Sequence, residues 1–456
     1  MIKFFNTKIE LQKHSDSVLS IIPPTHIFSL CRCHDCMARV LLVDGLRTPF
    51  QLPCTGYSNL TGADLLANAF RRLLSRLSLD KGDIGHVIAG NVLHEPSSPN
   101  VAAVSAARTG IIAPAHSVSM ACISGQAALS QGVNMIHTGQ AEIVLVGGVE
   151  FISDFPIRVS ENARKILLKI RNTEDRMEKV KLASKIRPRD LTPDILRVVE
   201  FQTQETFVAN GDKMAARFGV SRDAQDEFGY RSHALSRTAA KQGLFSNMMC
   251  SVHNPHSNTT IDSDSTLRDW KREKMGKLRP VRRAGTVTVA TANQPCDGAA
   301  ACLLASEGAA QRLNLNPRAQ ISRTAFAACS PFTELLMGST HALARLKSEQ
   351  GYDPGRAGVV ELYEGFAGEV LSQLSALRSS EYARTALSLD NPVADIEPGL
   401  VNRWGGSIGL GHPFGATGLR LLLHTVGRME AEKARLGIVA GCAGGGLGAA
   451  FAVTPV

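Results

Sequence analysis

Two cysteines and one histidine stand at positions in this 456-residue chain where their side chains could do chemistry. The first, Cys122, lies in the segment Ser119–Gly125, between a predicted short strand and a predicted helix. Helix amino ends carry partial positive charge, so this position favours a thiolate and makes Cys122 a candidate nucleophile. A single cysteine in apolar surroundings is more often a packing residue, and Cys122 considered alone could be one.

The other two candidates lie in glycine-rich segments near the end of the chain. His412 is held in Gly409–Gly418, where an imidazole could deprotonate a thiol or donate a hydrogen bond to a developing oxyanion. Cys442 follows the first glycine of Gly441–Gly448, whose free backbone N–H groups could bind an anion. That second run lacks the GxxxxGK[ST] pattern, which excludes a phosphate-binding P-loop.

Buried strands that alternate with amphipathic helices are predicted on both sides of these residues. Apolar runs and helical spacing predict strands at 39–43, 86–93, 116–120, 143–146, 359–363 and 436–442, and helices at 61–77, 101–109, 125–137, 366–377 and 416–434. This alternation predicts an α/β fold with helices covering the sheet.

The composition limits the class of protein. With 44% hydrophobic and 20% charged residues the chain is globular, and its length predicts at least two packed units. The net charge of +9 could indicate nucleic acid, an anionic membrane or a polyanionic substrate such as a nucleotide. Aromatic residues are only 5% and do not interleave with basic ones, so we expect no nucleic-acid partner. No apolar run is long enough to cross a bilayer.

Residues 1–38 differ in composition from the rest of the chain. They contain Cys31, Cys33 and Cys36, which could bind zinc, although structural zinc sites usually space the second ligand pair much further away. We interpret the segment as an extension or targeting leader, with a weak signal because it is poor in arginine and contains acids. The scattered remaining cysteines argue against a secreted disulfide framework. The chain ends without an SKL-type address, so a peroxisomal location is not expected.

A strongly basic segment, Ile157–Asp190, interrupts the α/β pattern. Its spacing predicts two short amphipathic helices on either side of a turn at Arg171–Thr173. One interpretation is a surface that contacts an anionic membrane through Lys165, Lys169, Lys179 and Lys181. The alternative is a solvated helical pair within an inserted domain.

Taken together, these segments resemble one family, the thiolases. The resemblance covers about residues 39 to 455. The segments similar to its signature blocks, opening strand and central block are Met120–Cys122, Gly405–Gly418, Cys442–Gly448, Val43–Phe50, Gly285–Thr288 and Asp297–Ala300. Within the family, Gly147–Arg158 looks most like the β subunits of mitochondrial trifunctional enzymes, and the basic helical pair falls where such subunits carry a membrane-associated hairpin.

The resemblance implies the thiolase fold, with two similar α/β halves in an αβαβα layered sandwich. The first half would span 39–315, with an inserted loop domain at about 153–284, and the second half 316–456. The resemblance further implies the activity of a 3-ketoacyl-CoA thiolase of fatty-acid β-oxidation, an acyltransferase that works through an acyl-cysteine. Coenzyme A would be a co-substrate, with no bound cofactor and no metal. Expected partners are a second copy in a homodimer, a trifunctional α subunit and an anionic membrane surface, in the mitochondrion.

The resemblance also implies residue roles. Cys122 would accept the acyl group, His412 would activate it and donate to an oxyanion, and Cys442 would handle the proton of the acetyl-CoA enolate. The amides of Cys122 and Gly444 would form a second oxyanion hole.

Two departures from the family pattern affect these roles. Tyr363–Phe366 reads Tyr-Glu-Gly-Phe where the family has Asn-Glu-Ala-Phe or His-Glu-Ala-Phe, so a phenol would be the donor in the first oxyanion hole. Thr291–Asn293 replaces an Asn-x-Ser run, and we expect Asn293 and Phe366 to contact substrate. A degenerate subunit that binds acyl-CoA or a partner without turnover remains an alternative. A condensing ketoacyl synthase is disfavoured, because Cys442 stands where it would carry a histidine.

Overall fold

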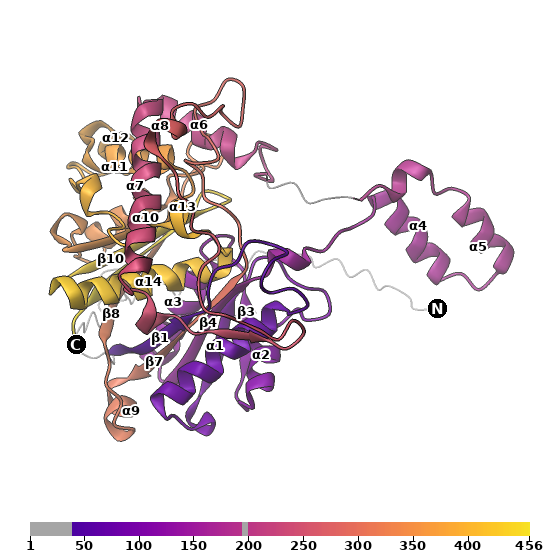
Figure 1. Ribbon diagram of the computed structural model, residues 1–456, viewed down its shortest axis with the longest axis horizontal. Coiled ribbons are helices and arrows are strands. Elements are labelled where there is room, and N and C mark those ends of the chain that lie inside the picture. The colour runs from indigo at the N-terminus through magenta and orange to yellow at the C-terminus, as the bar shows by residue number, and fades with distance from the viewer. Residues whose placement is uncertain (1–38, 194–198) are drawn as a thin grey trace, which may run out of the picture. The chain divides into compact units, whose positions relative to one another are not determined.

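In the computed structural model, which describes residues 39–193 and 199–456, nine strands form one mixed sheet (Figure 1). Their order is β3-β2-β4-β7-β1-β8-β11-β10-β9. The strands are β1 (Val40–Arg47), β2 (His86–Gly90), β3 (Ala115–Val118), β4 (Ile143–Glu150), β7 (Gly298–Ser306), β8 (Ala319–Ala328), β9 (Val359–Leu362), β10 (Gly437–Ala443) and β11 (Leu447–Thr454). The predicted leader and Cys31, Cys33 and Cys36 lie outside the described residues.

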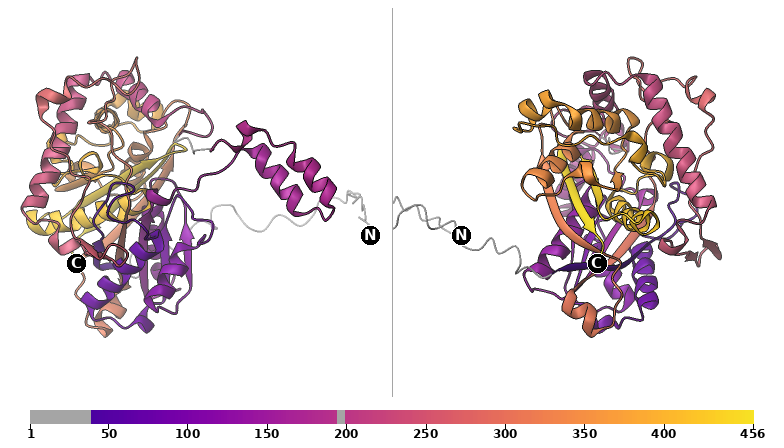
Figure 2. Two further views of the ribbon diagram at one scale, coloured as in Figure 1. Left: turned by 45° about the vertical axis from the view of Figure 1, so that its right-hand side comes forward. Right: turned by 90° about the vertical axis from the view of Figure 1, so that its left-hand side faces the viewer.

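The sheet consists of two halves with the same pairing pattern. In the first half β2 pairs parallel with β4, which pairs antiparallel with β7, and β7 pairs antiparallel with β1. In the second half β9, β10, β11 and β8 repeat these relations in the same order. The halves join where β1 meets β8 through the pairs Leu41–Gln320 and Leu42–Ala319. In Figure 2 the indigo-to-violet strands of the first half and the yellow strands of the second half lie in adjoining regions.

Side chains from the two faces of the sheet enter different hydrophobic cores. On β1, Leu41 and Val43 enter one core, whereas Val40 and Leu42 enter another, because successive side chains of a strand point to opposite faces. The second core is central: it combines strands from both halves with α3 (Ser124–His137) and α14 (Phe414–Glu432). The two central helices therefore lie between the half-sheets.

The outer faces of the half-sheets are covered by further helices. Against the first half pack α1 (Gly62–Leu77) and α2 (Val101–Thr109), with α9 (Glu307–Arg312) at its edge; against the second pack α10 (Gly338–Ser348) and α11 (Ala367–Arg378), followed by α12 (Ser380–Ala386) and α13 (Ser407–Leu410). Helices, half-sheet, central helices, half-sheet and helices make the expected αβαβα layers.

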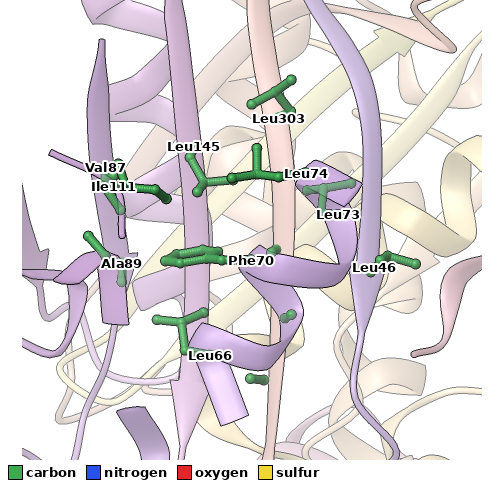
Figure 3. Close-up of a cluster of buried hydrophobic side chains, with 14 of the residues drawn as sticks. Leu46, Leu66, Phe70, Leu73, Leu74, Val87, Ala89, Ile111, Leu145 and Leu303 are labelled. Carbon is green, nitrogen blue, oxygen red and sulfur yellow. The ribbon is translucent and has the colours of Figure 1, made fainter. Parts of the chain in front are cut away.

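Helix α1 shows why the sequence forms these elements. Thr61 and Asp64 make a reciprocal capping box at its amino end, and Ser78 ends it in a left-handed conformation. Its buried stripe, which includes Leu66, Phe70 and Leu73, packs on the sheet (Figure 3). Full burial of one such side chain contributes about 1.5–3 kcal/mol, so the stripe holds the helix on the strands.

The chain between β4 and β7 forms an insertion of helices and short strands. It contains α4 (Glu161–Arg171), α5 (Arg176–Ala183), α6 (Phe207–Arg217), α7 (Arg222–Lys241), β5 (Val252–Asn254), β6 (Thr259–Ile261) and α8 (Arg272–Met275). Helices α6 and α7 contact α11 of the second half, so this insertion reaches the C-terminal part of the molecule.

The predicted helical pair is confirmed as α4 and α5. Ile166 of α4 and Leu182 of α5 are buried, and the two helices contact each other. Leu168, Met177 and Val180 are exposed. The ends of the segment are tied together, because Ser160 N–H donates to the Asp190 carbonyl at 3.2 Å. Within 39–193 and 199–456, no helix is both long and apolar enough to span a membrane.

Candidate active site

A cavity of about 330 Å³ collects every catalytic, oxyanion and substrate-contact residue expected from the sequence. Apolar side chains make up much of the remaining wall. The lining residues are Cys122, Thr206, Phe207, Val208, Ala292, Asn293, Pro295, Leu336, Tyr363, Gly365, Phe366, Glu369, His412, Phe414, Cys442, Ala443 and Gly444. The four candidate membrane lysines lie elsewhere, on α4 and α5.

Cys122 sits on a tight turn between β3 and α3. Its neighbour Ala121 adopts a φ of 46°, which is unfavourable for a residue with a Cβ and costs on the order of 1 kcal/mol. Ser124 stabilises the turn: its hydroxyl donates to the Ala121 carbonyl at 2.6 Å and accepts from Met120 N–H at 2.8 Å. The turn presents a partly buried thiol to the cavity.

Close backbone packing brings the start of α3 beside the start of α14. A Cβ on Gly125 would lie 2.3 Å from the Gly415 carbonyl oxygen, and one on Gly148 would lie 2.2 Å from the same atom. Only glycine permits this approach. Because Cys122 and His412 each precede one of these helices by a few residues, the contact places both at the same cavity.

His412 is buried and its ring orientation is set by one hydrogen bond. Nδ1 lies 2.7 Å from Thr417 Oγ1, whereas Nε2 has no hydrogen-bond partner among the described residues. Burial, together with the positive charge of Arg420, lowers the pKa of His412 to about 3. The imidazole is therefore neutral at physiological pH, with Nε2 available for proton transfer.

Cys442 lies at the end of β10, before a turn that requires glycine. Gly445 and Gly446 have φ values of 82° and 72°, and a Cβ on Gly446 would meet the Cys329 carbonyl oxygen at 2.2 Å. Glu200 accepts the Gly445 N–H at 2.8 Å and holds the turn from the insertion. The turn directs the N–H of Gly444 to the sulfur of Cys122.

The thiol of Cys122 is not ionised at rest, contrary to the expectation from its helix position. Burial raises the pKa of Cys122 to about 12, and hydrogen bonds from Tyr363 and the Gly444 N–H only partly offset that rise. Desolvation of a sulfur anion in this apolar cavity outweighs the partial charge of one helix end. The nucleophile must therefore lose its proton during the reaction, and a neutral imidazole in the same cavity is a suitable acceptor.

Tyr363 links Cys122 to Asn293. The Asn293 side-chain amide donates to the Tyr363 hydroxyl oxygen at 2.9 Å, and the phenol hydrogen-bonds the Cys122 sulfur. Burial raises the pKa of Tyr363 well above its usual value, so the phenol keeps its proton and can donate it in a hydrogen bond. The departure from the family pattern at position 363 thus places a donor on the candidate nucleophile.

Glu369 is the main cavity residue that the sequence analysis missed. It is fully buried near the start of α11, and its carboxylate accepts a hydrogen bond from the Cys442 thiol at 2.9 Å. A glutamate three residues after the residue that begins a helix is a capping-box pattern, which could have drawn attention to it. Phe207 and Val208 were also missed; they come from the insertion, and no motif marks them.

The chemistry available here is a thiol nucleophile, a neutral base and a second thiol that is hydrogen-bonded to a carboxyl. Backbone and phenol donors surround the first sulfur, where a developing negative charge would be stabilised. This set fits transfer of an acyl group through a covalent cysteine intermediate.

Comparisons with known proteins match nearly the whole described chain. Two family models, described as the thiolase N-terminal domain and the thiolase C-terminal domain, match residues 40–308 and 315–455. A Caenorhabditis elegans protein named probable 3-ketoacyl-CoA thiolase is 36% identical over 416 residues, which cover 90% of this chain and 93% of that protein. The human protein named trifunctional enzyme subunit beta, mitochondrial, is 37% identical over 418 residues, 91% of this chain and 88% of that one.

Solved structures match in fold as well. Human mitochondrial 3-ketoacyl-CoA thiolase in complex with CoA superposes with a TM-score of 0.78 at 26% identity, covering 92% of this chain and 99% of that one. Bacillus anthracis acetyl-CoA acetyltransferase superposes with a TM-score of 0.79 at 22% identity, covering 92% and 100%. At 22% identity, the likeness to the Bacillus anthracis enzyme shows the fold alone.

Proposed function

This chain belongs to the thiolase family, and we propose that it is a 3-ketoacyl-CoA thiolase, the acyltransferase that ends each round of fatty-acid β-oxidation. One observation carries the proposal: Cys122, His412 and Cys442, which come from three separate segments, line a single cavity. A thiolase reaction needs a nucleophile, a base for it and an acid for the departing carbon, and these three residues supply them.

The first half-reaction forms the acyl-enzyme. His412 takes the proton of the Cys122 thiol, and the sulfur attacks the C3 carbonyl of the 3-ketoacyl-CoA. The C2–C3 bond then breaks, and its electron pair moves to C2 as the enolate of acetyl-CoA. Cys442 gives its proton to C2, acetyl-CoA leaves, and the shortened acyl group remains on Cys122 as a thioester.

The second half-reaction releases the product. A new CoA thiol gives its proton to Cys442 and attacks the acyl carbonyl. The Cys122 sulfur is expelled and takes back its proton from His412. Coenzyme A is thus a co-substrate, and the net charge of +9 suits a ligand that carries several phosphates.

Stabilisation of the oxyanions falls to neutral donors around Cys122. Gly444 contributes a backbone N–H and Tyr363 contributes its phenol, both already directed at the sulfur. As the acyl group forms on that sulfur, its oxygen would lie within reach of the same donors and of His412 Nε2. Asn293 supports the phenol, and Phe366 provides apolar wall against which the substrate packs.

The experiment that tests the function is CoA-dependent cleavage by the purified chain. A long and a short 3-ketoacyl-CoA are mixed with CoA, and the loss of the 3-ketoacyl absorbance and the appearance of acetyl-CoA are followed. Turnover of either substrate, lost in Cys122→Ala, supports the proposal. Binding of acyl-CoA without cleavage or acylation would instead identify a degenerate subunit, for which the Tyr363 departure is the structural argument.

The relatives suggest the setting of this enzyme. The human and other mammalian relatives are named as mitochondrial β subunits of a trifunctional enzyme, and these names support our proposal of a mitochondrial location and an α-subunit partner for this chain. A second copy of the chain would complete a homodimer. Size-exclusion chromatography with light scattering, with and without the α subunit, tests both associations.

The pair α4–α5 is the segment we assign to membrane contact. Leu167, Leu168, Met177 and Val180 are exposed apolar residues on these two basic helices. Basic residues near an anionic surface contribute about 1 kcal/mol each, and salt screens that contribution. Binding should therefore be reversible, sensitive to salt and dependent on anionic lipid.

Co-sedimentation with vesicles tests the assignment. The parent should sediment with cardiolipin-containing vesicles and not with neutral ones. Changing Lys165, Lys169, Lys179 and Lys181 to Glu should abolish sedimentation. A matched control reverses four exposed lysines elsewhere, Lys81, Lys241, Lys271 and Lys433. Equal losses in both variants, or preference of the parent for neutral lipid, would contradict the assignment.

A further inference from the structure

The carboxyl of Glu369 is a buried acid that the two half-reactions do not use. It lies at the cavity wall, and its side chain is inaccessible to solvent. Its Oε1 accepts hydrogen bonds from the Cys442 thiol at 2.9 Å and from Gln373 Nε2 at 3.1 Å. Its Oε2 accepts from the Phe366 N–H at 3.1 Å. All three donors are neutral, so they orient the carboxyl without cancelling a negative charge.

The neighbouring chain leaves room for this carboxyl through glycine. A Cβ on Gly365 would lie 2.2 Å from Glu369 Oε2, closer than any real Cβ contact. The family pattern has alanine at this position, whereas this chain has glycine. The exchange clears the space in which Glu369 reaches Cys442, so the two residues form one arrangement.

Burial without a cationic donor makes the carboxyl reluctant to ionise. It raises the pKa of Glu369 to about 8, even though hydrogen bonds from Cys442, Phe366 and Gln373 act to lower it. The ionisable groups that face it are Cys442 from β10, Cys122 from the start of α3, and Tyr363 and Glu364 from the loop after β9. Near neutral pH the carboxyl therefore holds a proton within hydrogen-bond distance of a second acid.

We propose that Glu369 and the Cys442 thiol act as one acid–base unit, in which the carboxyl stores the proton that Cys442 exchanges with the C2 carbon of acetyl-CoA. This proposal rests on the proposed function and deepens it. Glu369 does not touch the substrate; it acts through the sulfur of Cys442. It orients that sulfur and exchanges a proton with it.

The protons balance over the full reaction. When Cys442 gives its proton to the enolate carbon, the carboxyl proton of Glu369 moves to the sulfur, and the negative charge remains on the carboxylate. When CoA enters, its thiol proton passes to the Cys442 sulfur as the proton already there returns to Glu369. The unit ends as it began, and a thiolate never persists in the apolar cavity.

The test separates two partial reactions. Acylation of Cys122 by an acyl-CoA, followed by intact-protein mass spectrometry, reports the nucleophile alone. Incorporation of deuterium at C2 of acetyl-CoA in D₂O reports the carbon–proton step. In Glu369→Gln the exchange should fall about tenfold at pH 9, while acylation stays within about threefold of the parent.

The pH dependence of the exchange rate is a second measurement. A merely structural role of Glu369 would not change it. Removal of a C2 proton needs the carboxylate, so parental exchange should rise with pH and level off above about pH 8. Glu369→Gln has no ionisable group there and should lose this rise. The reverse step needs the protonated carboxyl, so kcat/KM for a 3-ketoacyl-CoA should fall above about pH 8.

Two further variants guard against misfolding. Gly365→Ala keeps the carboxyl but displaces Oε2, and it should lower the ratio of exchange to acylation about three- to tenfold. Asp226→Asn changes a buried carboxyl of α7 that neither lines the cavity nor faces Glu369, and it should leave that ratio unchanged. Either Glu369→Gln or Gly365→Ala, whichever is folded, decides the question.

The outcomes distinguish the two proposals. If the parent acylates Cys122 and exchanges C2 protons, but neither variant at 365 or 369 alters their ratio, the Glu369–Cys442 unit is wrong and the thiolase function stands. If the parent neither acylates nor cleaves, the proposed function itself is wrong, and this inference with it.

Discussion

The two cysteines of the cavity have opposite hydrogen-bond environments. The sulfur of Cys122 accepts, from the phenol of Tyr363 and the backbone N–H of Gly444. The sulfur of Cys442 donates, to the carboxyl of Glu369. Donors stabilise a sulfur that becomes negative, whereas an acceptor draws the proton from a sulfur that must give and regain it. The proposed mechanism thus uses one residue type both as nucleophile and as acid–base group, because the neighbours of the two sulfurs differ.

Both thiols are neutral at rest, for the same reason. Burial raises the pKa of Cys122 to about 12 and that of Cys442 well above its usual value. The proposed difference between them therefore concerns the direction of proton transfer during the reaction: in the proposed mechanism His412 removes the proton of Cys122, and Glu369 returns a proton to Cys442 after Cys442 has given its own to the substrate.

Loss of the nucleophile should have the largest effect. Cys122→Ala should reduce cleavage of a 3-ketoacyl-CoA by about 10⁴-fold or more, because no covalent intermediate can form. Mass spectrometry should find a thioester on Cys122 in the parent and none in the variant. Cys54→Ala, at an exposed cysteine outside the cavity, is the control. An acyl adduct centred on Cys442 would reverse the roles assigned to the two thiols.

Loss of the base should come next. His412→Asn should slow acylation of Cys122 by about 10²- to 10⁴-fold. Because the pKa of His412 is lowered to about 3, its ring is neutral and able to accept a proton at any pH above that value. Acylation by the parent should show no inflection from this residue between about pH 5 and pH 8. An inflection near pH 6.5 that disappears in His412→Asn would contradict the neutral base.

Removal of the second thiol should affect one half of the chemistry selectively. Cys442→Ala should reduce deuterium exchange at C2 of acetyl-CoA by about 100-fold, since Cys442 handles that proton. Acylation of Cys122 should change by less than about threefold. Equal losses of exchange and acylation would mean that the two sulfurs do not divide the work as their hydrogen bonds indicate.

The smallest effect should come from the phenol. A hydrogen bond to a charged group contributes about 1.5–3 kcal/mol, so Tyr363→Phe should slow acylation about tenfold to a hundredfold. Asn293→Ala, which only removes support from the hydroxyl, should cost a few-fold. Single-turnover acylation measures both. Full activity of Tyr363→Phe would show that the hydroxyl does not assist Cys122.

Local sequence determined much of the architecture. Helical spacing predicted α1 and α2 to within a residue, and apolar runs located β4 and β10. Other strands escaped prediction: β7 is an unbroken run of small and apolar residues, whose pattern does not separate strand from buried helix. The motif residues were also identified: His412 and Cys442 by their glycine-rich segments, and Cys122 by its position between a predicted strand and a predicted helix.

The tertiary structure alone decided what those residues do to one another. Spacing in the chain could not reveal that Glu369 reaches Cys442 or that Tyr363 reaches Cys122, since these contacts join different elements across the cavity. Nor could it show that burial outweighs the helix end at Cys122, because desolvation depends on everything that surrounds the sulfur. The type of each residue and its backbone preference are local properties that the sequence determines. The proton affinity of a side chain depends on the packed environment around it.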